Sequence, residues 1–187
     1  MVTTVDLPAA GGFAPALRRL YFVRFAFAIV WAALLFTTTK SGLPPVGVAL
    51  VILYPLFDVG SAIVDARSSR AAGPARGLYV NMAISLLATV GIAIGSASGI
   101  PAVLRVWGAW AIVAGLIQLV VAITRRRMGG QWPMILSGGI SVLAGANFVL
   151  SAGAANPSLS TVAGYAVLGG IFFLVSAIRL GRTPKAN

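Results

Sequence analysis

The chain has 187 residues, of which 59% are hydrophobic and 9% charged, and its formal net charge is +11 at pH 7. Soluble domains carry about 25% charged residues, so this composition indicates a membrane protein. There is no His, Cys or Glu, and the acidic residues are Asp6, Asp58 and Asp65. This inventory excludes His-based triads, His or Cys metal sites and a Glu general base. We therefore expect no enzymatic activity, no cofactor and no metal.

Residues 1–19 mix small residues with Pro, Thr and Arg and are interpreted as a cytoplasmic lead. Six apolar runs of about 20 residues follow, the length that a helix needs to cross about 30 Å of hydrocarbon. A helix satisfies its own backbone hydrogen bonds, so each run predicts a transmembrane helix. The runs are Leu20–Thr38, Leu43–Ala66, Gly77–Ser98, Pro101–Thr124, Trp132–Ala152 and Ser158–Leu180. Residues 20–180 thus form one six-helix domain, and residues 181–187 a tail.

The basic residues are distributed unequally between the two sides of this domain. The N-terminal segment, the connections after the second and fourth runs and the C-terminal end each hold three, so twelve lie on one side and only Lys40 and Arg105 on the other. Cytoplasmic loops of membrane proteins are enriched in Lys and Arg. Both termini are therefore predicted in the cytoplasm, and the protein in the bacterial inner membrane. The charge indicates topology and contact with anionic lipid headgroups, and we expect no nucleic-acid partner.

The outer connections share a small polar stretch followed by proline. The prolines are Pro44, Pro101 and Pro157, which are 57 and 56 residues apart. The inner ends of the even-numbered runs also match, as SAIVDAR, VAITRR and SAIRLGR. This pattern predicts an all-α membrane protein built as three tandem helical hairpins, at about 20–66, 77–124 and 132–180. The alternative is a chance match between membrane sequences of similar composition.

Several segments resemble the HdeD-like family of small bacterial membrane proteins. They are WGAWAIVAGLIQLVVAITRR, MILSGGISVLAGANFVLSAGAANP and GYAVLGGIFFLVSAIRLGR. The resemblance covers nearly the whole chain and implies six helices in repeated hairpins, Gly-rich helices and basic inner ends. It also implies a non-enzymatic role in envelope or acid-stress maintenance.

Polar residues recur at equivalent positions of the repeat. Counting back 20 residues from each outer proline gives Arg24, Asn81 and Ser137, and aligning the SAI segments matches Asp58 with Gln118 and Phe173. Arg24, Asp58, Asn81, Gln118 and Ser137 are therefore predicted to form a polar layer in the inner half of the membrane.

Two interpretations of this layer remain open. Intramembrane charges are costly and usually have a partner or a function. Arg24 and Asp58 lie on adjacent antiparallel runs at similar depth, so they could form an ion pair that only fixes helix packing. Alternatively, the layer binds a proton or a small solute in a transporter or channel, with Asp58 as the titrating group. A lipid-modifying enzyme built on Asp58 and Asp65 would lack the usual acid–base pair.

Two further features concern the helices themselves. Pro55 removes a backbone hydrogen bond and is predicted to kink the second helix. Small residues spaced by four predict close helix contacts within the bundle or between subunits, so a homo-oligomer is left open. These are Gly91, Gly95 and Gly99 in the third run, and Ser137, Ser141 and Gly145 in the fifth.

Overall fold

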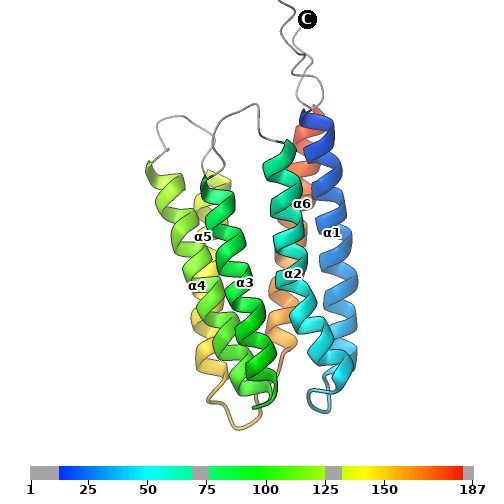
Figure 1. Cartoon of the computed structure of the whole chain (residues 1–187), viewed down its shortest axis with the longest axis vertical. Coiled ribbons are helices and arrows are strands. Elements are labelled where there is room, and N and C mark those ends of the chain that lie inside the picture. Colours follow the sequence, from blue (N-terminus) through cyan, green and yellow to red (C-terminus); the bar gives the residue numbers. More distant parts are fainter. Residues whose placement is uncertain (1–12, 69–75, 125–131, 183–187) are drawn as a thin grey trace, which may run out of the picture.

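The computed structural model describes residues 13–68, 76–124 and 132–182. These residues form six α-helices and no strand, so the predicted all-α class is confirmed for this part of the chain (Figure 1). The helices are α1 (Phe13–Thr38), α2 (Pro45–Ser68), α3 (Arg76–Ser96), α4 (Ile100–Thr124), α5 (Trp132–Ser151) and α6 (Ser160–Arg182). α1 begins at Phe13, inside the segment interpreted as a lead, so that segment is partly helical.

Short turns connect α1 to α2, α3 to α4 and α5 to α6 at one end of the bundle, which we call the turn end. Gly42 and Gly99 have positive φ angles of 132° and 82° in two of these turns, a conformation that glycine adopts readily. Pro45 occupies the first position of α2, where its missing N–H costs no helical hydrogen bond. Gly99 therefore belongs to a turn and does not extend the packing stripe of α3, contrary to the prediction.

The opposite end, which we call the basic end, is where α1 begins and α6 ends (Figure 1). Its described basic residues are Arg18, Arg19, Arg67, Arg76, Arg179 and Arg182, and Arg24 lies further along α1 in the same half of the bundle. Lys40 and Arg105 lie toward the turn end. Arg70, Arg125, Arg126, Arg127 and Lys185 lie outside the described residues. The segregation of charge along the bundle is thus visible, and the assignment of the basic end to the cytoplasm remains a prediction.

Five of the six helices are long and apolar enough to cross a membrane. α5 has 20 residues, but its described apolar part, Ile135–Ser151, is shorter than the other spans. The sixth crossing therefore remains a prediction. It is favoured by the packing of α5 along α4, which does have the length of a span.

The helices contact one another most extensively in the pairs α4–α5, α1–α6 and α2–α3. The pairs within the predicted hairpins, α1–α2, α3–α4 and α5–α6, contact one another less. The closest packing therefore joins each even-numbered helix to an odd-numbered helix of the adjacent predicted hairpin, with α6 next to α1.

Glycine explains the closest of these pairs. A Cβ on Gly145 of α5 would lie 2.6 Å from the carbonyl oxygen of Gly108 in α4, and a Cβ on Gly115 would lie 2.7 Å from that of Gly138. The two backbones approach too closely for any larger residue, as small residues allow in membrane helices. Gly91 and Gly95 make looser contacts, with Val106 and Ala102 at the α3–α4 interface. The predicted stripes thus serve two different interfaces.

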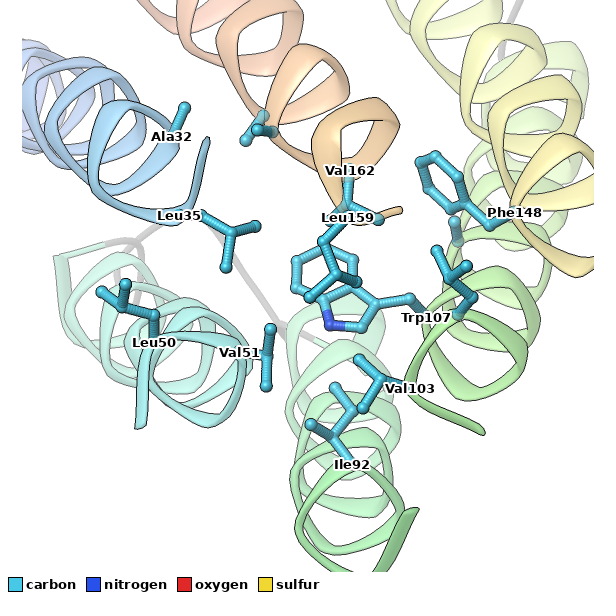
Figure 2. Close-up of a cluster of buried hydrophobic side chains, with 14 of the residues drawn as sticks. Ala32, Leu35, Leu50, Val51, Ile92, Val103, Trp107, Phe148, Leu159 and Val162 are labelled. Carbon is cyan, nitrogen blue, oxygen red and sulfur yellow. The ribbon is translucent and has the colours of Figure 1, made fainter. Parts of the chain in front are cut away.

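The buried hydrophobic core occupies the half of the bundle next to the turn end. Side chains from all six helices gather around Trp107, which is fully buried (Figure 2). Among them are Leu35, Val51, Ile92, Phe148 and Val162. The indole N–H of Trp31 donates to the Leu50 carbonyl at 2.7 Å and ties α1 to α2 within this core. The bundle is therefore densely packed toward the turn end.

Candidate functional site

Between this core and the basic end the bundle contains a partly open cavity of about 490 Å³. All six helices contribute to its wall. Volumes of about 300–1,000 Å³ are typical of small-molecule sites. The predicted polar layer lies in this wall: the structure places Arg24, Asp58, Asn81, Gln118 and Ser137 around the one cavity.

Asp58, on α2, is the best-connected polar group of the cavity. Its Oδ1 accepts a hydrogen bond from the Arg24 guanidinium of α1 at 2.5 Å, and the two residues form an ion pair. Its Oδ2 accepts from Asn81 at 2.7 Å and from Ser85 at 2.9 Å, both on α3. Side-chain exposures of 19% for Arg24 and 11% for Asp58 show that the pair is largely withdrawn from the surroundings. One carboxylate thus links three helices.

Arg24 has a second partner on α6, the helix that packs against α1. Its guanidinium carbon lies 4.2 Å from the centre of the Phe173 ring on α6. A cation at this distance from an aromatic face is attracted by the ring quadrupole. The Tyr21 ring also lies 5.7 Å from that of Phe173, so the arginine sits in a partly aromatic environment. The guanidinium has five N–H groups, and the bond to Asp58 uses one of them.

The positions matched by the predicted repeat lie around the same cavity. Arg24, Asn81 and Ser137, from the odd-numbered helices, all line it. So do Asp58, Gln118 and Phe173, the matched positions of the even-numbered helices. Positions that the predicted repeat would make equivalent therefore line one shared cavity, although their side chains differ in chemistry.

Aromatic side chains form much of the remaining wall. They are Tyr21, Tyr54, Trp110, Tyr165, Phe172 and Phe173. The indole N–H of Trp110 is buried and has no hydrogen-bond partner within the described structure. The Tyr165 hydroxyl pairs with Ser141 at 2.8 Å, a contact that joins α6 to α5. The cavity is therefore amphipathic, with flat apolar faces beside hydrogen-bonding groups.

Other predicted residues have different roles. Ser141 lies in the α4–α5 interface and the cavity wall, and its hydroxyl also donates to the Ser137 carbonyl at 2.9 Å. α2 continues through Pro55, which is buried. The predicted kink at Pro55 is not tested and stays a prediction.

Several residues that line the cavity or bond to Asp58 were not predicted from the sequence. Ser85 follows Asn81 by four residues, and Tyr54 precedes Asp58 by four, so helical spacing placed each beside a predicted residue. Trp110, Tyr165 and Ser176 carried no such signal, because aromatic and small hydroxyl residues are common throughout membrane helices. Their place in the wall is a result of tertiary packing.

The arrangement is suited to binding. An ion pair of net zero charge lies beside aromatic faces, and neutral donors surround it. Within the described residues no group of three His, Cys, Asp or Glu side chains comes together. What the site offers chemically is hydrogen bonding, aromatic contact and a carboxylate whose bonding could be exchanged.

Fold and site together define a multi-pass helical membrane protein with an amphipathic cavity between its helices. No protein-family model matches the chain, and no curated protein or solved structure is significantly similar to it.

Proposed function

We propose that the protein binds a small organic solute in this cavity and carries it across the membrane. The observation that carries the proposal is the cavity itself, which surrounds the Asp58–Arg24 pair in an otherwise apolar bundle. A purely structural ion pair needs no space beside it. An ion pair that lines about 490 Å³ of space can exchange one of its bonds for a bond to a ligand.

The wall favours one class of solute. Both oxygens of Asp58 already accept hydrogen bonds, whereas Arg24 and Gln118 contribute N–H donors. Aromatic faces on α1, α2, α4 and α6 favour a flat or apolar body. The proposed ligand is therefore a small, compact organic solute with an apolar body and hydrogen-bond acceptors, such as an amide or a carboxylate.

Binding is testable with purified protein. Because Trp110 lines the cavity, a panel of aromatic amides, carboxylates and amines is screened for quenching of tryptophan fluorescence and for a rise in melting temperature. We expect amides or carboxylates to bind, and Gln118→Leu to weaken the binding. The proposal is contradicted if no compound binds, or if Gln118→Leu and a variant on the lipid face, Leu116→Ala, behave alike.

Transport is tested in proteoliposomes with the ligand found by the screen. Asp58→Asn removes the carboxylate charge while keeping the shape of the side chain. Asp65→Asn removes a charge from the same helix at a residue that does not line the cavity. We expect loss of solute or proton flux only for Asp58→Asn. The transport proposal is contradicted if the wild type and Asp58→Asn both show only background flux.

A second candidate is the HdeD-like role in envelope or acid-stress maintenance. It is supported by the residue pattern and by the convergence of repeat-equivalent positions on one cavity. Under this proposal the protein resides in a bacterial inner membrane with the basic end in the cytoplasm. A deletion strain with unchanged survival in acid and unchanged envelope integrity would count against it.

A further inference from the structure

A shallow groove on the outside of the bundle follows one face of α1 at the basic end. It is lined by Pro15, Arg18, Arg19, Phe22, Val23 and Ala26. These positions recur every three to four residues, so they form a single stripe along the helix. The groove is separate from the internal cavity, with which it shares no lining residue.

The chemistry of the stripe changes along its length. Arg18 and Arg19 are exposed near the start of the helix, and Phe22 and Val23, 37% and 47% exposed, follow toward the bundle centre. Val30 and Leu34 continue the exposed apolar face toward the turn end. A cationic site at the membrane boundary followed by an apolar track matches the shape of a phospholipid.

The Arg18 side chain is held in place by contacts with α1 and α6. Its guanidinium carbon lies 5.5 Å from the centre of the Phe22 ring. It also rests against α6, where a Cβ on Gly181 would lie 2.8 Å from that carbon. Among the residues that the structure describes, no carboxylate pairs with Arg18, in contrast to Arg24. Its charge is therefore positioned but not neutralised by any residue that the structure describes.

We infer that this groove binds an anionic phospholipid, with the lipid phosphate on Arg18 and Arg19 and an acyl chain along Phe22 and Val23. Guanidinium groups bind phosphate through paired N–H donors. Basic residues at a membrane surface strengthen the binding of anionic lipid by about 1 kcal/mol each, or about fivefold. The inference does not depend on the proposed solute site.

The test measures binding of phosphatidylglycerol and phosphatidylcholine to the purified full chain in detergent by native mass spectrometry. We expect the wild type to prefer phosphatidylglycerol, and R18Q/R19Q to bind it about 25-fold more weakly. R105Q removes one exposed positive charge toward the turn end and serves as the charge control. Equal losses in R18Q/R19Q and R105Q, or no preference between the lipids in the wild type, would overturn the inference.

Gly181→Ala tests the position of the Arg18 guanidinium without removing its charge. The added methyl group displaces the Arg18 guanidinium, which is the mobile end of a long side chain, so the helices need not shift. We expect weaker phosphatidylglycerol binding with an unchanged melting temperature in lipid-free detergent. Millimolar inorganic phosphate is the competitor arm: little competition supports a lipid site, and full displacement of phosphatidylglycerol would show a free-phosphate site instead.

Discussion

Asp58 illustrates how a costly residue is retained inside a membrane protein. A charged side chain at membrane depth is unfavourable unless it is paired or hydrogen-bonded. Arg24, Asn81 and Ser85 together supply a cation and two neutral donors to its two oxygens. Removing one partner therefore affects a network rather than a single bond.

The first prediction concerns the charge pair. Arg24→Gln leaves the Asp58 carboxylate without its cation, so we expect a loss of about 3 kcal/mol in unfolding free energy. Adding Asp58→Asn removes the stranded charge, and the double variant should regain more than half of that loss. Unfolding of the four proteins in mixed micelles measures the cycle. Additive losses from the two substitutions would show that the pair is not coupled.

The sequence made Arg24 and Asp58 recognisable because charges are rare in apolar runs. It also placed Asn81, Gln118 and Ser137 at equivalent depth through the repeat, and the structure brings all five to one cavity. It gave no comparable signal for Trp110 or the other aromatic wall residues. For Trp107, only packing reveals that its side chain is fully buried in the core.

At the scale of helices, the pair α4–α5 depends on backbone contact. Gly108 faces Gly145, and Gly115 faces Gly138, so the interface has no room for side chains at these points. Helix number and approximate bounds followed from apolar length alone. Helix pairing did not, because these helices carry glycine on several faces and apolar length says nothing about which face meets which neighbour.

The second prediction separates packing glycines from others on the same helix. Gly145→Ala puts a methyl group 2.6 Å from a backbone oxygen of α4, so we expect a loss of about 1–3 kcal/mol in stability. Gly139, also on α5, has no atom within 4 Å of an added Cβ. Gly139→Ala should therefore be neutral or up to about 1 kcal/mol more stable. Melting temperatures test the pair, and similar values for both variants would contradict the close contact.

For the whole molecule, the central feature is the contrast between its two halves. The core fills the half next to the turn end, whereas the cavity lies in the half next to the basic end. Hydropathy could not predict this contrast, because apolar residues face both lipid and core in a membrane protein. The distribution of charge did predict two chemically different ends.

The third prediction concerns orientation. Because basic residues accumulate on the cytoplasmic side, a fluorescent protein that matures only in the cytoplasm should fluoresce when fused after Asn187. The same reporter fused after Ser41, in the turn that follows α1, should remain dark. The opposite pattern in bacterial cells would invert the topology.

The most direct test of the cavity uses the absence of cysteine from the chain. Ser137 lines the cavity, whereas the adjacent Leu136 is 56% exposed on the outside of the bundle. Ser137→Cys and Leu136→Cys place a thiol at nearly the same depth, one facing the cavity and the other facing outward. A thiol reacts as its thiolate, which forms only where water is present. A charged, membrane-impermeant thiosulfonate should modify Ser137→Cys roughly tenfold or more faster than Leu136→Cys, and only when added from the basic end. Equal, slow modification of both variants would contradict a hydrated binding cavity at Asp58.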